Sequence, residues 1–497
     1  MPVSLTRSLS PKKTRSETLK RTFVTNLILL VGLNLLVKPF YLLVVETEIQ
    51  NRVGAETFGG YFALINFSFI LNILLDLGTT NWNTRHTARH ETITAKQFSG
   101  MLTLRLLLAL AYVICAMTIG LLLHYSAWQL FILFVLGINQ VLASTVLYLR
   151  SYLTGLHLFR HDSVISVLDR LLLVFMMSAL LWGSFGTFRI EWLVWGQTIA
   201  YGITCLVALA MVITRSGAIK MSFDRNFLRG VLKESMPFAW LILLSMIACR
   251  VDGLLLERIS GGREAGIYAM GFRFFDAVNM FAYLFAVLLL PLFSRMLKKE
   301  QDVSALVHLG FKILFSGTFI IAVFSWFFGD HILAMVYDNN IGEASEVFSW
   351  LMLSAFFFAM QYVFGTLITA GGNMRLMIYI ALGSMVYNIV LNLFYIPHMG
   401  ALGAARVSCF TQFIVLAAQV GVVMHRFAIT GVKQLAIRTL VFALVCVGVG
   451  LFFSRQTIIM LTPAYSSGLF LLLALAAALT TRMLDIRRFV ELLRTRE

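Results

Sequence analysis

The sequence has few charged residues and very little proline. Charged residues make up 13% of the 497 positions and only seven residues are proline, whereas 59% are hydrophobic and the mean hydropathy is +0.85. A water-soluble protein could not hide that much apolar surface, but a protein embedded in lipid does not need to. The composition therefore excludes an ordinary soluble domain and indicates a membrane protein.

Cysteine is also scarce, and its positions exclude the usual structural uses of a thiol. None of the five cysteines forms a CxxC pair, and each lies within an apolar stretch: Cys115, Cys205, Cys249, Cys409 and Cys446. Such cysteines are typical of small buried hydrophobic side chains rather than of disulfides or metal ligands. We therefore expect no metal site, and nothing in the sequence indicates a cofactor.

Acidic residues are outnumbered by basic ones. The 40 Lys and Arg residues against 24 Asp and Glu give a formal net charge of +16. Nucleic-acid-binding proteins carry such a surplus, but no basic domain with interleaved aromatic residues lies outside the apolar stretches. We therefore exclude nucleic acid as a partner and expect the basic segments to attract anionic membrane lipids.

Fourteen apolar stretches of roughly 20 residues are each long enough to cross a ~30 Å hydrocarbon core as a helix. They must be helices, because an open strand in lipid leaves its backbone polar groups unpaired. The predicted spans are residues 23–45, 58–83, 99–123, 126–150, 163–183, 190–213, 237–257, 265–292, 306–329, 346–370, 374–397, 400–424, 434–454 and 463–482.

The basic residues outside the spans fall mainly on one side of the membrane. When the connecting segments are numbered alternately, the even side holds roughly 28 of the 40 Lys and Arg residues and the odd side about five. Because basic loops stay in the cytoplasm, this bias predicts a multi-pass protein with both termini cytoplasmic. No A-x-A cleavage site follows the basic N-terminal stretch, which indicates an uncleaved first span rather than a signal peptide.

A repeated motif divides the chain into two halves. A Gly-x-Tyr motif begins at Gly59 and again at Gly266, and the predicted outer loops before the two motifs contain Gly54 and Gly261, all at a constant shift of 207 residues. The recurrence predicts a duplication, and two parallel repeats around a central cavity are a common transporter plan.

The predicted organisation follows from the spans and the repeat. It consists of a cytoplasmic basic tail 1–22, an N-terminal lobe 23–213, a cytoplasmic inter-lobe loop 214–236, a C-terminal lobe 237–424, and a segment 425–497 that holds the last two spans and a basic tail.

Several segments carry a family resemblance. They are Leu74–Gly78, Gly266–Ala269 with Leu290–Arg295, and Tyr387–Ala405, of which the N-x-x-x-N…IP-x-x-G-x-x-GAA string from Asn388 to Ala405 is the most specific. Together they resemble Wzx-type polysaccharide (O-antigen) flippases of the multidrug/oligosaccharidyl-lipid/polysaccharide (MOP) exporter superfamily. The match spans most of residues 20–425, and Arg406 departs from it, because we expect a neutral residue there.

The resemblance implies an all-α polytopic membrane protein with about 14 transmembrane helices. Two pseudo-symmetric six-helix lobes would surround a central cavity, and a two-helix annex would follow. The implied protein is a transporter of the bacterial inner membrane, not an enzyme. It would move an undecaprenyl-pyrophosphate-linked anionic oligosaccharide across the membrane by alternating access, for surface polysaccharide such as O-antigen of lipopolysaccharide, with H⁺ or Na⁺ as a counter-ion.

Two other classes compete with this interpretation. Another exporter of the superfamily, for lipid II or for drugs, has the same fold, but a cationic drug requires acids where this chain offers bases. A membrane polymerase or ligase needs a sizeable outer loop with catalytic groups, whereas the predicted outer loops are short and hold no His/Asp/Glu cluster.

Three basic residues within the spans are the candidate substrate-binding residues. A charge at mid-depth costs about 2.5–3.5 kcal/mol, so such residues are expected to face protein or a wet cavity. Lys38 and Arg250 lie at similar depths in the first and seventh spans, which correspond under the repeat, and Arg273 lies in the eighth. Guanidinium and ammonium groups suit phosphate, so we expect the three to share a cavity that binds the lipid-linked pyrophosphate. Buried ion pairs that bridge helices are the alternative.

Three acids in the spans are candidates for ion coupling or for pairing. Asp276 is one turn from Arg273 and is expected to pair with it, and Asp252 is expected to pair with Arg250 or Arg273 across helices. Asp76 is either a coupling site for H⁺ or Na⁺ or a helix-packing acid. Other charges, including Arg105, Asp169 and Arg170, are interpreted as interfacial or structural, and Asn388 and Asn392 as an interhelical hydrogen bond.

Overall fold

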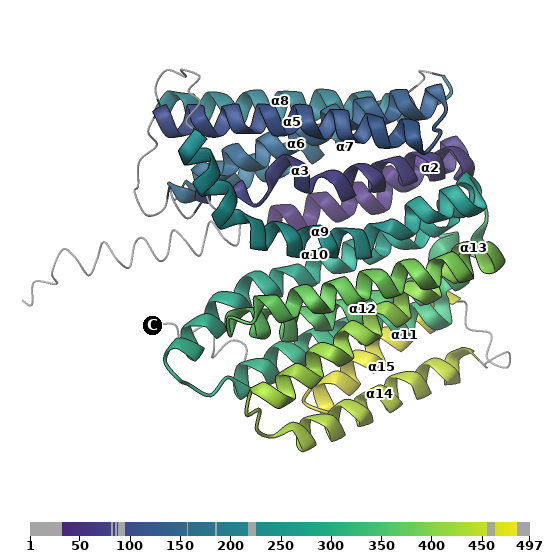
Figure 1. The fold of residues 1–497 in the computed structure, drawn as a ribbon. Helices are drawn as coiled ribbons and strands as arrows, with labels where there is room; N and C mark the ends of the chain where they lie inside the picture. The colour runs from purple at the N-terminus through teal and green to yellow at the C-terminus, as the bar shows by residue number, and fades with distance from the viewer. Residues whose placement is uncertain are drawn as a thin grey trace, which may run out of the picture.

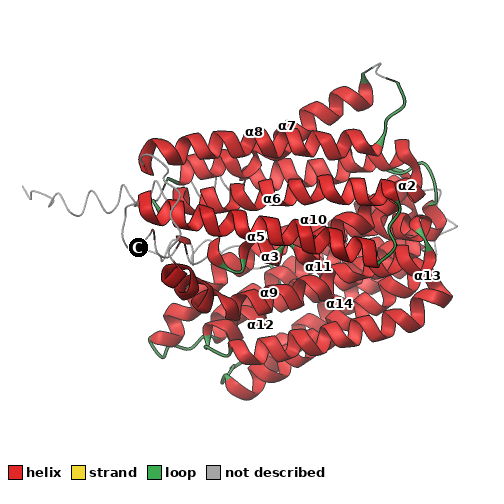
Figure 2. Ribbon diagram, turned by 45° about the horizontal axis from the view of Figure 1, so that its top comes forward, coloured by secondary structure: helices red, strands yellow, loops and turns green. Residues whose placement is uncertain are grey.

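A computed structural model describes residues 32–80, 83–84, 87, 95–156, 158–183, 186–216, 225–454 and 463–484 of the chain. These residues form helices joined by turns and contain no strand (Figure 2), so the all-α prediction is confirmed. The predicted tail 1–22 lies outside the described residues, as do parts of the inter-lobe loop 214–236 and of the C-terminal tail.

The described helices occur in the following order along the chain. They are η1 (Tyr41–Val45), α2 (Glu46–Leu71), α3 (Ile73–Asp76), α5 (Ala95–Leu122), α6 (Ala127–Gly155), α7 (Phe159–Trp182), α8 (Ile190–Ser216), α9 (Arg225–Ser260), α10 (Gly262–Lys298), α11 (Ser304–Ala334), α12 (Ile341–Ala370), α13 (Met374–Arg426), α14 (Val432–Ser454) and α15 (Pro463–Thr480).

The helices form two bundles. Figure 1 shows α5, α6, α7 and α8 on one side of the molecule and α11, α12 and α13 on the other. We call η1 to α8 the first bundle and α9 to α13 the second bundle; they meet where α2 contacts α9 and α10. The last two helices, α14 and α15, lie at the far edge and pack against α11. The predicted lobe boundaries stay a prediction.

The longest helix reverses direction within its length. A straight helix of the 53 residues of α13 would be about 80 Å long, more than twice the ~30 Å hydrocarbon thickness. Gly400 breaks it with a φ of 52°. Side-chain atoms of Met377 and Gln419, one from each arm, lie 3.4 Å from the position that a Cβ would take on Gly365 of α12. The two arms of α13 therefore lie side by side.

The helix of residues 32–76 folds back in the same way at Gly54, because Glu46 and Phe58 on either side of that glycine both contact Arg273. Ten helices in the described part of the chain are long and apolar enough to cross a membrane, and these two hold two predicted spans each. The predicted number of fourteen spans is not confirmed.

The repeated glycines share an unusual backbone conformation. Gly54 has φ 81° and ψ 163°, and Gly261, at the matching position of the second half, has φ 90° and ψ 173°. Residues with a side chain rarely adopt a positive φ, so glycine is required at both turns. We call the end of the molecule that holds Gly54, Gly261 and Gly400 the hairpin end.

At the hairpin end the two bundles touch through glycine. A Cβ on Gly59 of α2 would lie 1.8 Å from the carbonyl oxygen of Gly262, and one on Gly266 of α10 would lie 2.0 Å from that of Ala55. Gln50 also donates to the carbonyl oxygen of Gly266 at 2.9 Å. Small residues allow this backbone approach. We call the contact between α2 and α10 the glycine seam; its Gly59 and Gly266 are the glycines that begin the repeated motif.

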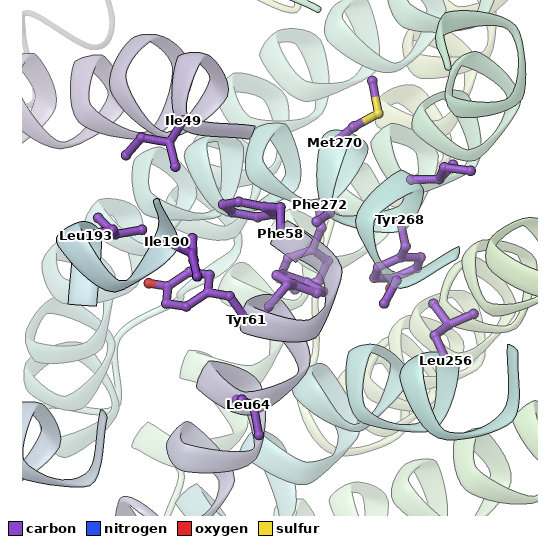
Figure 3. Packing of buried hydrophobic residues seen from close by; sticks show 14 of the residues in the cluster. Ile49, Phe58, Tyr61, Leu64, Ile190, Leu193, Leu256, Tyr268, Met270 and Phe272 are labelled. Carbon is purple, nitrogen blue, oxygen red and sulfur yellow. The ribbon is translucent and has the colours of Figure 1, made fainter. Parts of the chain in front are cut away.

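Aromatic side chains extend the seam into the interior. Figure 3 shows Phe58 of α2 beside Phe272 of α10, whereas Tyr61 points toward Ile190 and Leu193. The ring centroids of Phe62 and Phe272 lie 5.6 Å apart in an edge-to-face arrangement. Such a pair contributes about 0.5–1.5 kcal/mol beyond the area that it buries.

The glycine seam predicts a position-specific effect of a single methyl group. Gly59→Ala places a Cβ against backbone that cannot move aside, so we expect a loss of about 1–3 kcal/mol and a lower melting temperature of the detergent-purified protein. Gly202→Ala in α8 is the matched control, because nothing lies within 4 Å of its Cβ and alanine favours a helix. Equal melting of the two variants would contradict the seam.

Candidate functional site

A cavity lies between the two bundles, below the glycine seam. Its volume is about 270 Å³, and η1, α2, α6, α7, α8, α9 and α10 all contribute to its wall. The charged residues that line it are Glu46, Arg170, Arg250, Arg273 and Asp276. The lining therefore holds three guanidinium groups and two carboxylates, and a third carboxylate, that of Asp169, pairs with Arg170 from outside the lining. We call this space the central cavity.

Arg273 is the least exposed of the three arginines. Its side chain is only 4% exposed, its Nη1 donates to the Tyr337 hydroxyl at 2.9 Å, and its Nε lies 3.8 Å from Oε2 of Glu46. The guanidinium carbon stands 4.2 Å from the centre of the Phe58 ring. Among the described residues, Nε and Nη2 have no hydrogen-bond acceptor. Arg273 therefore lines the cavity and holds two buried nitrogens that lack an acceptor.

Arg250 is held by a carboxylate across helices. Its Nη1 lies 3.1 Å from Oδ2 of Asp276, its Nη2 donates to Oδ1 of the same residue at 3.2 Å, and Asn66 accepts at 3.3 Å. The predicted pairing of Asp276 with Arg273 on one face of α10 is therefore wrong. The carboxylate of Asp276 points to α9 instead, and Glu46 of α2 takes its place beside Arg273.

Arg170 is a cavity residue that the sequence did not identify. Its Nη2 donates to the Tyr201 hydroxyl at 3.1 Å, its Nε lies 3.5 Å from Oδ2 of Asp169, and its guanidinium stands 5.0 Å from the Tyr41 ring centre. The tyrosines that contact Arg170 belong to other helices. The sequence shows only that an arginine lies within a predicted span, so it could not indicate these partners.

Lys38 does not line the central cavity. It is half-buried and lies near enough to Asp169, Arg170 and Arg150 to interact with them electrostatically. The prediction that the side chains of Lys38 and Arg250 line the same cavity is therefore wrong. The cavity holds Arg170 where the sequence suggested Lys38.

Asp252 is buried in the second bundle and has neutral partners. Its side chain accepts from the Tyr268 hydroxyl at 3.0 Å and from Nδ2 of Asn392 at 2.8 Å, and the residue is 1% exposed. Asn392 also donates to Asn388 at 3.0 Å. The predicted pairing of Asp252 with an arginine is wrong, whereas the interhelical bond expected of Asn392 is confirmed. No cation pairs with this carboxylate among the described residues.

Asp76 belongs to a separate ion pair inside the first bundle. Nη2 of Arg105 lies 2.5 Å from Oδ1 of Asp76, and Arg105 also donates to the carbonyl and hydroxyl oxygens of Ser144, both at 3.0 Å. Arg105 is 5% exposed, so its role is structural, which is one of the two roles expected of it. Asp76 is thus placed to join α3 to α5 and α6, away from the central cavity.

Profiles of two families match the sequence. The profile described as polysaccharide biosynthesis protein matches residues 23–297, more than half of the chain, and the profile described as MatE matches residues 237–394.

Curated relatives have low identity. An uncharacterized membrane protein of Methanocaldococcus jannaschii is 24% identical over 77% of this chain and 92% of its own length. The capsular polysaccharide biosynthesis protein CapF of Staphylococcus aureus is 22% identical over 43% of this chain, and the lipid III flippase of Escherichia coli is 22% identical over 42%. The matches span about half of these two relatives, 56% and 51% of their lengths.

Solved transporter structures share the fold. The lipid II flippase MurJ in an inward closed conformation superposes with a TM-score of 0.71 at 15% identity, over 94% of this chain and 99% of that one. An inward-facing multidrug resistance MATE family transporter of the MOP superfamily has a TM-score of 0.61 at 12% identity, over 78% of this chain and 95% of that one. The fold predicted from the sequence is therefore confirmed.

The Asp76–Arg105 pair predicts a characteristic pattern of stability. Arg105→Met leaves the Asp76 charge without its partner, and we expect a loss of about 3–5 kcal/mol. Adding Asp76→Asn removes that charge, so the double variant should melt higher than Arg105→Met alone. Additive losses in the double-mutant cycle would show that the two side chains do not act as a pair.

Proposed function

This chain belongs to the family of polysaccharide biosynthesis proteins, and we propose that it is a flippase for undecaprenyl-pyrophosphate-linked oligosaccharide repeat units, destined for surface polysaccharide. It is an integral membrane transporter of the MOP superfamily, so the resemblance found in the sequence is confirmed. The observation that carries the proposal is the gathering of three guanidinium groups at the central cavity, together with the two nitrogens of Arg273 that lack an acceptor.

A pyrophosphate suits this cavity chemically. Guanidinium groups donate paired, charge-assisted hydrogen bonds to phosphate oxygens, and these bonds are stronger than neutral ones. Arg273 has two nitrogens without acceptors, and Arg250 and Arg170 stand on other helices around the same space. The three guanidinium groups would attract this anion, whereas they would repel a cationic drug. The cavity therefore favours an anionic cargo over a multidrug substrate.

Movement of the cargo follows from where the cavity is closed. The charge bias of the loops assigns the hairpin end to the outer face of the bacterial inner membrane, with both termini cytoplasmic. The glycine seam blocks the cavity toward that end, so outward opening requires α2 to separate from α10. We propose that lobes 23–213 and 237–424 rock about the loop 214–236, while the polyprenyl chain stays in lipid.

The proposed site residues differ in whether they contact the substrate. Arg250 and Arg273 contact the pyrophosphate directly, and Arg170 joins them. Lys38 contributes through the positive field around Arg170, because it does not line the cavity.

Charge removal in the cavity predicts a graded loss of export. In a strain that lacks the native gene, we expect Arg273→Gln and Arg250→Gln to abolish export, because each removes a guanidinium group that would bind the pyrophosphate. We expect Lys38→Gln to reduce export less. The measurement is the amount of lipid-linked repeat units that accumulates in the membrane. Arg375→Gln at the exposed start of α13 is the control. Normal export by both cavity variants, at equal membrane levels, would refute the proposal.

Asp252 is the proposed coupling group for H⁺ or Na⁺. A buried carboxylate surrounded by Tyr268, Asn388 and Asn392 has oxygen atoms near it, and no basic side chain of the described residues pairs with it. An unpaired charge is expensive there, so the site is stabilised by protonation or by a bound cation. Asp276, beside Arg250, is proposed to hold that arginine in place rather than to couple an ion.

The coupling proposal predicts a selective defect. Asp252→Asn keeps the shape and most hydrogen bonds but removes the ionisable group, so export should lose its dependence on an ion gradient. Inverted membrane vesicles loaded with lipid-linked repeats, with an imposed H⁺ or Na⁺ gradient, measure this. The idea fails if the variant responds as the wild type does, or if neither gradient stimulates the wild type.

A further inference from the structure

A second, larger space lies at the hairpin end, outside the central cavity. This groove has a volume of about 840 Å³, and both bundles contribute to it. Polar and aromatic side chains at the starts of α6 and α8 meet others from α2 and α9, among them Arg52, Glu56, Trp128, Gln129, Glu191 and Glu257. We call this space the outer groove.

The groove combines a flat aromatic ring with carboxylates. Trp128 is 36% exposed, and its indole nitrogen donates to Oε1 of Glu191 at 2.7 Å. This bond fixes the ring at the groove wall. Gln129 donates to Oε1 of Glu257 at 2.8 Å and so ties α6 to α9. A sugar presents apolar C–H faces that stack on a ring and hydroxyls that pair with carboxylates and amides.

The charge of the groove differs from that of the central cavity. Its three carboxylates, on Glu56, Glu191 and Glu257, face two guanidinium groups, on Arg52 and Arg189. The groove therefore offers no positive excess to a pyrophosphate. Mixed charges with an oriented aromatic ring suit a neutral, hydroxyl-rich ligand instead.

A single turn of α2 separates the two spaces. Phe58 and Tyr61 line the central cavity, whereas Thr57 and Gly60 line the outer groove. Gly262, a member of the glycine seam, also borders the groove. When α2 leaves α10, the groove and the cavity become one continuous space.

We propose that the outer groove is a carbohydrate-binding site that receives the sugars of the cargo while the arginines still hold its phosphates. The identification of the sugar as cargo rests on the proposed function. The site gives the glycan an acceptor on the outer side before the headgroup is released, and Trp128 is its anchor.

The test measures sugar binding without transport. The probe is the free oligosaccharide cleaved by mild acid from the host cell's own polyprenyl-linked pool. Saturation-transfer NMR on the full-length, detergent-purified protein should show contact with sugar protons. Trp128→Ala should weaken binding by about tenfold or more, as expected for loss of an aromatic anchor, and Trp128→Phe should keep most of it. Trp182→Ala is the matched control, because Trp182 is 57% exposed at the end of α7 and lies outside the groove.

Each outcome decides the matter. Loss of the signal in Trp128→Ala alone supports the site. An unchanged signal in Trp128→Ala, an equal loss in Trp182→Ala, or no signal from the wild type overturns it. Failure of the proposed function would appear differently, as no accumulation of lipid-linked repeats when the gene is deleted.

Discussion

A guanidinium group buried within a bilayer needs an anion, and three such groups gather at the central cavity. Glu46 and Asp276 stand beside Arg273 and Arg250, and Arg170, which pairs with Asp169, brings a third guanidinium group to the same space. The cost of such a charge in hydrocarbon is a few kcal/mol, which a bound phosphate would offset. The proposed diphosphate headgroup would add the phosphate oxygens that the Nε and Nη2 atoms of Arg273 lack as acceptors.

The glycine seam relates this electrostatic demand to movement. The backbones of α2 and α10 approach so closely at Gly59 and Gly266 that the cavity cannot open toward the hairpin end without separating them. Below the seam the same two helices carry the cavity wall, with Phe58 and Arg273 in contact. Under the proposed alternating access, a ligand that changes the balance of charge around Arg273 would act on the two helices that separate.

The sequence predicted the helical class and the repeat, but not the partners of the charges. Gly54 and Gly261 could be found from their constant spacing, because a backbone with a positive φ requires glycine at both positions. The pairings of Asp252 and Asp276 were predicted wrongly because the rotation of α9 against α10 decides them, and spacing along one helix carries no such information. Arg170 was missed for the same reason, since its partners lie on other helices.

The central claim is that the cavity arginines recognise a diphosphate at the end of a polyprenyl chain. Its most direct test compares undecaprenyl pyrophosphate with undecaprenol as ligands of the purified protein, by the shift in melting temperature. We expect the pyrophosphate to raise the melting temperature of the wild type clearly more than the alcohol does, and expect the double variant Arg250→Gln/Arg273→Gln to lose that difference. Equal shifts from the two lipids in the wild type, or an undiminished difference in the double variant, would contradict the account.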